Sequence, residues 1–285
     1  MSKLLIVGAG TMGHGIAQVA AMAGFDTTLT DSLADALTSA LERIQQNLDG
    51  GVARGKLTAD EAAAAMGHVH VDPDMESAAG EADLVIEAIV EDLAVKRALF
   101  AKLDTVTAAD AILATNTSSL SVAVIADATS RPERVVGMHF FNPVHIMKLV
   151  ELVRHDATAD VVVDRARDVA VRMGKQPIVV RDSPGFASSR LGVVLGLEAM
   201  RMVEQQVASA EDIDKALELG YGHPMGPLRV SDLVGLDVRL AIAEYLHKEL
   251  GDPHYEPPAL LRDKVAAGEL GKKTGKGFYE WPKTK

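Results

Sequence analysis

The chain opens with a short apolar run that leads directly into three regularly spaced glycines, Gly8-x-Gly10-x-x-Gly13. Lys3–Val7 has the continuous apolar character of a buried parallel strand. An Ala-rich stretch, Met12–Ala23, then has helical character and stops at Gly24, a residue typical of helix C-termini. Strand, glycine turn and helix in this order constrain the fold strongly, because they make up the first half of a βαβ unit with a phosphate-binding turn.

The glycine spacing predicts a dinucleotide site. Gly8 permits the tight turn, Gly10 lets the backbone approach a pyrophosphate, and Gly13 lets the helix pack on the strand. The start of the helix, at Thr11 and Met12, offers free N–H groups and a positive dipole end to the phosphates. We take these five residues as cofactor-binding candidates. The alternative is an ordinary strand, turn and helix in which the glycines serve only the turn.

A carboxylate ends the second expected strand, Asp26–Asp31. Asp31 follows Gly13 by 18 residues, where an acid accepts hydrogen bonds from the adenosine ribose. It would repel a 2′-phosphate, and Ser32 and Leu33 supply no compensating arginine. The sequence therefore predicts NAD rather than NADP, although Asp31 could also cap the helix that follows it.

Short β-branched runs continue to alternate with helical stretches over about the first 180 residues. The further expected strands are His68–Val71, Ala82–Ile89, Ala111–Ala114, Arg134–Phe140, Leu149–Arg154 and Pro177–Arg181. The expected helices include Ser32–Val52, a short helix with a capping box at Thr58, Asp92–Thr107 and Asp160–Gly174. This βαβα pattern predicts an α/β fold with a doubly wound, Rossmann-like parallel sheet.

The character of the sequence changes at Arg181–Phe186, where Asp-Ser-Pro-Gly forms a cluster of breakers. Only helical patterns follow, namely Ala187–Gln206, Ala210–Leu219, Leu228–Leu250 and Pro257–Ala267. We therefore expect an NAD-binding domain over residues 1–183 and an all-α substrate and dimerisation domain over residues 184–285. The apolar faces of these helices fit a homodimer interface, but they could equally be internal core.

Composition limits the partners and the chemistry. The formal net charge of −11 argues against nucleic acid or an anionic membrane surface as a partner, but not against an anionic small molecule. The absence of cysteine excludes disulfides, thiolate metal sites and cysteine nucleophiles, and we expect no metal. No apolar run reaches the roughly 18 residues of a membrane span. Because the N-terminus also starts directly with a strand, without a signal peptide, we expect a cytoplasmic protein.

One acid interrupts an otherwise apolar strand pattern at Glu151. An uncompensated buried carboxylate is costly, so Glu151 needs a partner. A salt bridge to Lys148 or Arg154 is one possibility, and His139 is the other. A histidine titrates near neutral pH, and a carboxylate on one ring nitrogen fixes its tautomer and stabilises the imidazolium. Residue type alone leaves both partners open.

Six ordered blocks of the sequence resemble the 3-hydroxyacyl-CoA dehydrogenase family, particularly its short bacterial 3-hydroxybutyryl-CoA dehydrogenases. The blocks are the glycine turn, Val85–Lys96, Ala114–Leu120, Gly137–Glu151, the Asp-Ser-Pro-Gly-Phe run and Gly271–Tyr279. The resemblance extends over essentially the whole chain. It implies a Rossmann-like N-terminal domain followed by a helical domain that forms the dimer.

The resemblance also implies roles for individual residues. His139 matches the catalytic base, Glu151 its carboxylate partner, and Ser118 the serine that contacts the substrate hydroxyl. The residues that match the nicotinamide side of the NAD site are Glu91, Lys96, Asn116 and the C-terminal Lys273, and Asn142 is a substrate-binding candidate. Judged by residue type alone, the charged members could be solvated surface groups, and Ser118 could be a turn or helix cap.

Two further substrate contacts are expected from the resemblance. The family usually has asparagine in Pro-Gly-Phe-x-x-Asn-Arg, whereas this chain has Ser189. A serine is shorter, so it would act through a bridging water, or another group would replace the contact. The acyl-CoA is expected to lie against the helix and turn that hold Arg54 and Lys56, which could meet a phosphate or could be an ordinary solvated helix end.

We therefore predict an NAD-dependent oxidoreductase that interconverts (S)-3-hydroxyacyl-CoA and 3-oxoacyl-CoA. One alternative is a dehydrogenase of a free hydroxy acid or sugar acid on the same fold, for which Ser189 leaves room. Another is a non-enzymatic NAD-binding protein like the dehydrogenase-derived lens crystallins, and the joint presence of His139, Glu151 and Ser118 argues against it. The sequence leaves open the acyl chain, including a dicarboxylic preference, and the physiological direction.

Overall fold

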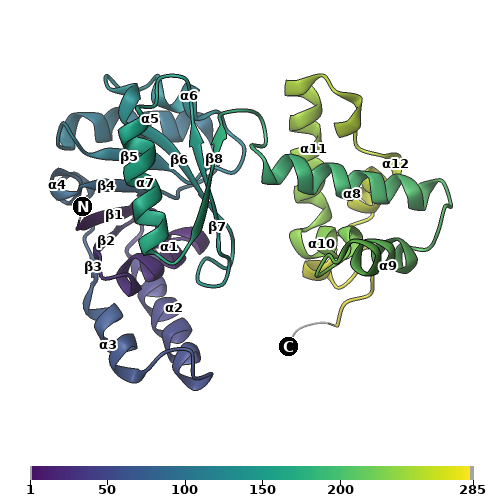
Figure 1. The fold of residues 1–285 in the computed structure, drawn as a ribbon, viewed down its shortest axis with the longest axis horizontal. Coiled ribbons are helices and arrows are strands. Elements are labelled where there is room, and N and C mark those ends of the chain that lie inside the picture. The colour runs from purple at the N-terminus through teal and green to yellow at the C-terminus, as the bar shows by residue number, and fades with distance from the viewer. Residues whose placement is uncertain (1, 283–285) are drawn as a thin grey trace. The chain divides into compact units, whose positions relative to one another are not determined.

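The computed structural model describes residues 2–282 and divides into two compact units, Met1–Ser183 and Pro184–Lys285 (Figure 1). The first unit is a sheet covered by helices, and the second is built of helices. No helix among the described residues is both long and apolar enough to cross a membrane.

The first unit contains a single eight-stranded sheet. Its strands are β1 (Lys3–Val7), β2 (Asp26–Thr30), β3 (Val69–Val71), β4 (Leu84–Glu87), β5 (Ile112–Thr115), β6 (Val135–Phe140), β7 (Leu149–Arg154) and β8 (Gln176–Arg181). Its helices are α1 (Thr11–Met22), α2 (Ala34–Ala53), α3 (Ala59–Gly67), α4 (Met75–Glu81), α5 (Leu93–Val106), α6 (Val122–Ala126) and α7 (Asp160–Arg172), with a 3-10 turn at Pro132–Arg134. The strand order is β3-β2-β1-β4-β5-β6-β7-β8. The Rossmann-like fold class is confirmed.

Helices bury both faces of this sheet, which explains the continuous apolar character of its strands. On one face, Ile6 and Ile86 belong to a core that also contains Ile16 of α1 and Val162 of α7. The alternate side chains of the same strands are also fully buried, as at Val85. On that side α4 contacts β1 and β2, and α6 contacts β6. Figure 1 shows α7 crossing the sheet in front of β6 and β8.

Two strands, β7 and β8, run opposite to the other six and depart from the expected all-parallel sheet. β6 and β7 are antiparallel, whereas the other neighbouring pairs are parallel. Only residues 141–148 connect β6 to β7, and a parallel return needs a crossover of about a dozen residues or more. The short connection therefore forces the chain to reverse direction. In the resulting register His139 stands directly opposite Glu151.

The second unit is a bundle of helices with a core of its own. Its helices are α8 (Ser188–Glu204), α9 (Ala210–Tyr221), α10 (Pro227–Val234), α11 (Leu236–Leu250) and α12 (Ala259–Ala266), with 3-10 turns at Pro253–Tyr255 and Lys272–Thr274. The prediction of one helix over Leu228–Leu250 was wrong. Gly235 has φ +103°, which no residue of an α-helix adopts, so the chain bends there and forms two helices.

Candidate active site

The glycine turn between β1 and α1 has no room for a side chain at two of its positions. Gly8 has φ +104°, and a Cβ there would lie 2.7 Å from the carbonyl oxygen of Ala88. A Cβ on Gly13 would lie 1.7 Å from the carbonyl oxygen of Gly8. Gly10 has no atom within 4 Å of the corresponding position, so its backbone faces open space. The first and third glycines thus permit close packing, and the second leaves room for a ligand.

Asp31 stabilises the same turn from the end of β2. Its Oδ2 accepts a hydrogen bond of 2.7 Å from the N–H of Ala9, and its Oδ1 accepts one of 3.0 Å from the N–H of Leu33. The carboxylate is therefore anchored beside the turn and at the start of α2. The N-cap of α2 is Leu33, so Asp31 does not cap this helix, and the bond from Ala9 was not evident from the sequence.

A cavity of about 570 Å³ opens between the glycine turn and α5. Gly8 and Asp31 line it on one side, and Ile89, Val95 and Leu99 supply apolar walls. An apolar slot next to a carboxylate suits an adenine ring and its ribose. The glycine turn, the helix start and this cavity together fit the pyrophosphate and adenosine half of an NAD molecule.

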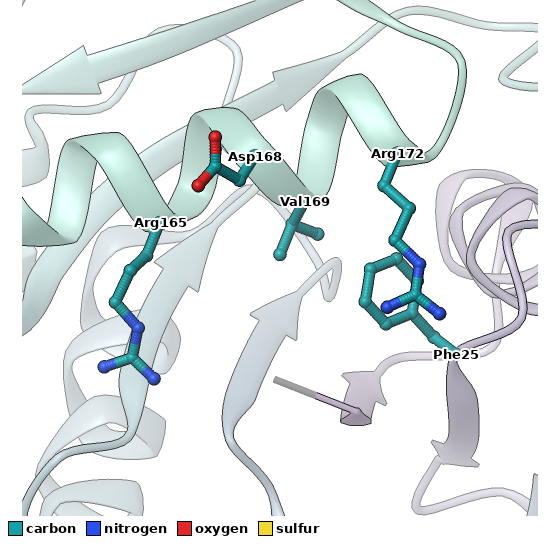
Figure 2. A pocket seen from close by; sticks show the side chains of 5 residues that line it. All are labelled: Phe25, Arg165, Asp168, Val169 and Arg172. Carbon is teal, nitrogen blue, oxygen red and sulfur yellow. The ribbon is translucent and has the colours of Figure 1, made fainter.

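A second cavity, of about 180 Å³, lies at the other end of the strands (Figure 2). Its lining residues are Phe25, Arg165, Asp168, Val169 and Arg172. The Arg172 guanidinium stacks on the Phe25 ring at 3.8 Å and donates to the carbonyl oxygens of Ala23 and Gly24. Phe25 precedes β2, so this cavity is at the amino end of the strand and apart from the candidate site.

Three charged side chains form a network at the carboxyl ends of β4 and β5, in which Glu87 and Lys96 are buried and the Glu91 side chain is 39% exposed. The Lys96 Nζ atom, on α5, lies 2.5 Å from Glu87 Oε1 and 3.3 Å from Glu91 Oε2. Glu87 and Lys96 are at most 1% exposed. Glu87 also accepts hydrogen bonds from Thr115 Oγ1 and the N–H of Ile89. A lysine this deeply buried requires such carboxylate partners, because an isolated buried charge is very costly.

Glu91 connects this network to Ser118. Its Oε1 accepts hydrogen bonds from Thr117 Oγ1 at 2.6 Å, from the N–H of Ser118 at 2.9 Å and from Ser118 Oγ at 3.2 Å. Burial opposes the charged form of Glu91, but the hydrogen bonds from Thr117 and Ser118 and the charge of Lys96 outweigh it, so the pKa of Glu91 is lowered. Ser118 is thus held in place by an ionised carboxylate.

Asn116 links the end of β5 to the end of β6. Its Oδ1 accepts a hydrogen bond of 2.8 Å from the N–H of Phe140, and its own N–H donates to the carbonyl oxygen of Glu87. Because Phe140 follows His139, this bond fixes the backbone next to the histidine.

His139 and Glu151 form a buried pair between the antiparallel strands. The His139 Nδ1 lies 2.8 Å from Glu151 Oε2, and the two side chains are 9% and 0% exposed. A carboxylate only accepts, so we assign the proton to Nδ1, which leaves Nε2 as the basic nitrogen. The ring of Phe141 lies 4.4 Å from the imidazole. Arg154, the other partner considered for Glu151, pairs with Asp160 at 2.9 Å.

The remaining candidates lie in the connection after β6, just beyond α2, or in the second unit. Asn142 is exposed in the connection between β6 and β7. Arg54 is the C-cap of α2, with its guanidinium over Gly50, and Lys56 is exposed just beyond it.

Two of the predicted residues belong to the second unit. Ser189 is in the first turn of α8. The Nζ atom of Lys273 lies 2.6 Å from the Asp237 carboxylate.

Two residues of interest were not predicted from the sequence. Glu87 ends an apolar strand, the same signal that singled out Glu151. His145 lies in the connection between β6 and β7, where burial and then the charges of Arg54, His14 and Lys175 lower its pKa. No sequence pattern predicts that these basic groups lie in one region, because they come from four separate segments.

Comparisons with known proteins agree with this geometry. Residues 3–183 match the model of the 3-hydroxyacyl-CoA dehydrogenase NAD binding domain, and residues 185–281 match that of the C-terminal domain. The 3-hydroxybutyryl-CoA dehydrogenase of Mycobacterium tuberculosis is 46% identical over 99% of both chains. A probable 3-hydroxybutyryl-CoA dehydrogenase of Bacillus subtilis is 44% identical over 99% of this chain and 98% of that protein.

A solved structure is similar over the same length. The (S)-3-hydroxybutyryl-CoA dehydrogenase PaaH1 of Ralstonia eutropha superposes with a TM-score of 0.96 at 39% identity, over 99% of this chain and 100% of that chain. The NAD binding domain match confirms the predicted cofactor. On the strength of both domain matches and the full-length relatives, the chain belongs to the 3-hydroxyacyl-CoA dehydrogenase family.

Proposed function

We propose that this protein is an NAD-dependent dehydrogenase that interconverts (S)-3-hydroxyacyl-CoA and 3-oxoacyl-CoA, with 3-hydroxybutyryl-CoA as a representative substrate. The main support is the buried His139–Glu151 pair, held 2.8 Å apart at the end of β6. The activities named for the Mycobacterium tuberculosis and Ralstonia eutropha relatives add to it.

His139 acts as the general base in the oxidation. Its Nε2 accepts the proton of the substrate hydroxyl, while the Nδ1–H donates to Glu151 and the carboxylate stabilises the imidazolium that forms. NAD, when bound, accepts the hydride from the hydroxyl-bearing carbon. In the reverse direction the imidazolium returns its proton to the oxygen of the substrate. A histidine suits both directions because its ordinary pKa is about 6.5.

The network around Glu91 orients the reacting groups. Ser118 contacts the substrate hydroxyl, and its position is set by its two hydrogen bonds to Glu91. Glu91, Lys96 and Asn116 line the nicotinamide side of the cofactor site. Their support is their location at the carboxyl ends of β4 and β5, next to the glycine turn after β1.

The CoA part of the substrate binds to basic residues of the first unit. Arg54 and Lys56 hold its phosphates, supported by the positive field that Arg54, His14 and Lys175 create at His145. Asn142, Ser189 and Lys273 complete the substrate and cofactor contacts, and Ser189 contributes its single hydroxyl.

We further propose that the two units have different roles. Residues 1–183 bind NAD, and residues 184–285 contribute to substrate binding and form a homodimer. Large apolar side chains that remain exposed on α8, α10 and α11 support the dimer, namely Leu191, Leu195, Leu233, Val234 and Val238. We place the reaction in the cytoplasm, where its cofactor and thioester substrate are available.

An absorbance assay of NADH formation tests the reaction. We expect turnover of (S)-3-hydroxybutyryl-CoA with NAD, and at least about 100-fold lower kcat/KM with free 3-hydroxybutyrate or with NADP. Equal turnover of the free acid would favour the hydroxy acid alternative. Tight NAD binding without turnover of any 3-hydroxyacyl-CoA would favour a non-enzymatic NAD-binding protein.

A further inference from the structure

A buried lysine of the first unit contacts the connection between the two strands that carry His139 and Glu151. Lys175 immediately precedes β8 and is 8% exposed. Burial lowers the pKa of Lys175, and among residues 2–282 no carboxylate forms an ion pair with it. An ammonium in such a place needs other polar partners, because a buried charge without them is very costly.

Two backbone carbonyls of the connection are these partners. The Lys175 Nζ donates to the carbonyl oxygen of Val144 and, at 2.9 Å, to that of Met147. Both acceptors belong to residues 141–148, which join β6 to β7. Since β8 pairs with β7 along its whole length, the backbone of Lys175 is fixed beside the sheet, and its ammonium holds the connection there.

Packing against α1 holds the same connection at a second place. Val144 is 2% exposed, and a Cβ added to Gly15 would lie 2.8 Å from Val144 Cγ2. Gly15 belongs to the helix that begins at the glycine turn, so its missing side chain lets Val144 pack directly on this helix. The connection is therefore fixed between the helix of the cofactor turn and the start of β8.

The proposed base and its partner lie at the two ends of the connection. His139 precedes the last residue of β6, and Glu151 is the third residue of β7. The ring of Phe141, the first residue of the connection, lies 4.4 Å from the imidazole. A shift of the connection would therefore move the imidazole relative to its carboxylate, and a misplacement of about 1 Å at a reacting group lowers a rate by roughly 100-fold.

We propose that Lys175 is a positioning residue for the reaction, whose ammonium holds the connection so that His139 stays aligned with Glu151. This inference rests on the proposed function and adds to it a residue outside the reacting groups. Lysine fits the role because its N–H donors serve two acceptors at once and form charge-assisted hydrogen bonds. Both acceptors are main-chain atoms, so the lysine fixes the path of the backbone.

A purely structural role is the competing explanation. It would lower the melting temperature and the amount of folded enzyme, but not the rate of the chemical step in the molecules that fold. Single-turnover kinetics separates the two explanations. With enzyme and NAD in saturating excess over the thioester, the first-order rate constant of NADH formation does not depend on the folded fraction.

The test measures this rate constant for (S)-3-hydroxybutyryl-CoA in the full-length protein. We expect Lys175→Met to lower it by about 100-fold and to leave the Kd for NAD unchanged. Arg172→Met is the matched control, since Arg172 also donates to two backbone carbonyls, those of Ala23 and Gly24, apart from the candidate site. This control should lose melting temperature and keep the rate constant of the wild type.

Chemical rescue distinguishes the ammonium from the bulk of the side chain. The chain contains no cysteine, so Lys175→Cys supplies a single thiol that can be alkylated in the unfolded chain before refolding. Alkylation with 2-bromoethylamine restores an ammonium at nearly the length of lysine, whereas 1-iodopropane adds an equally long chain without it. We expect the aminoethylated protein to regain most of the wild-type rate constant and the propylated protein to stay slow.

A variant of α1 keeps the test decisive if the Lys175 variants do not fold. Gly15→Ala places a methyl group 2.8 Å from Val144 Cγ2 and favours the helix, so we expect a folded protein with a displaced connection and a lower rate constant. An unchanged rate constant in any folded Lys175 variant or in Gly15→Ala overturns the proposal, as do equal rate constants after the two alkylations. If the wild type turns over no 3-hydroxyacyl-CoA, the proposed function itself fails.

Discussion

Two buried carboxylates illustrate how single residues shape this molecule. Glu151 and Glu87 are both fully buried in apolar strands, and each has a nitrogen partner within 2.8 Å. The partner of Glu151 was predictable because a short return brings β7 beside β6. The partner of Glu87 is Lys96 on the helix after the strand, and the sequence pattern did not reveal that this lysine points inward.

Replacing His139 by alanine should remove the general base without changing the NAD-binding residues. We expect kcat/KM for 3-hydroxybutyryl-CoA to fall by about 10²–10⁴-fold, with the Kd for NAD, measured by fluorescence titration, within about 2-fold of the wild type. His70→Ala, at an exposed histidine paired with Asp26, is the control and should be fully active. Near-normal turnover by the His139 variant would refute the base assignment.

His145 should make stability depend on pH. Its pKa is lowered by burial and by the charges of Arg54, His14 and Lys175. The unfolded chain, with an ordinary pKa of about 6.5, therefore binds more protons than the folded one below that pH, and this contribution to stability is lost as pH falls. We therefore expect the melting temperature of His145→Asn, compared with that of the wild type, to rise as the pH is lowered from 8 to 5.5. Melting curves that shift in parallel would contradict this.

At the scale of elements, four strand ends build the candidate site. The carboxyl ends of β1, β4, β5 and β6 lie along one edge of the sheet and carry Gly8, Glu87, Asn116 and the residues after His139. Ligands bind at this edge in doubly wound sheets, because the strand order reverses there. The antiparallel β7 adds Glu151 from the neighbouring strand, so a departure from the all-parallel pattern completes the pair.

Asp31→Arg tests the end of β2 as the determinant of cofactor choice. The arginine would attract a 2′-phosphate, so we expect the NADP-to-NAD ratio of kcat/KM to rise by about 10-fold or more. Because Asp31 also anchors the N–H of Ala9, activity with NADP should stay below that of the wild type with NAD. Asp35→Arg, at an exposed residue in the first turn of α2, is the control. An unchanged cofactor ratio would show that Asp31 does not contact the ribose.

For the whole molecule, the distribution of exposed apolar residues is informative. The protein carries a net charge of −11, yet α8, α10 and α11 of the second unit expose several large aliphatic side chains. A symmetric dimer would bury this surface in both copies, so one substitution would change both sides of the interface.

Val234→Asp should weaken the proposed dimer. Val234 is 43% exposed on α10, so the isolated chain should tolerate a carboxylate there, while an apolar interface would not. We expect light scattering after size-exclusion chromatography to give the mass of a dimer for the wild type and of a monomer for the variant. Val161→Asp, at a 58% exposed valine of α7, should leave the mass unchanged. If both variants have the mass of a dimer, the interface lies elsewhere.

Local patterns determined much of this protein from the sequence alone. The glycine turn, the strands, the capping box at Thr58 and the helical character of the second unit depend on neighbouring residues, which is why spacing and residue type predicted them. The capping box forms as expected, with Glu61 donating its N–H to Thr58. The roles of His139, Glu151 and Ser118 stay predictions, although their proximity to suitable partners is a property of the structure.

Tertiary structure decided the features that depend on which distant segments meet. The reversal of β7 and β8, the break at Gly235 and the contacts of Lys96 with two glutamates all depend on packing between separated elements. The type of a residue indicates which partners it requires, but local spacing predicts contacts only within one turn or one strand. Whether a charged group finds its partner inside the chain is therefore settled only when the elements pack.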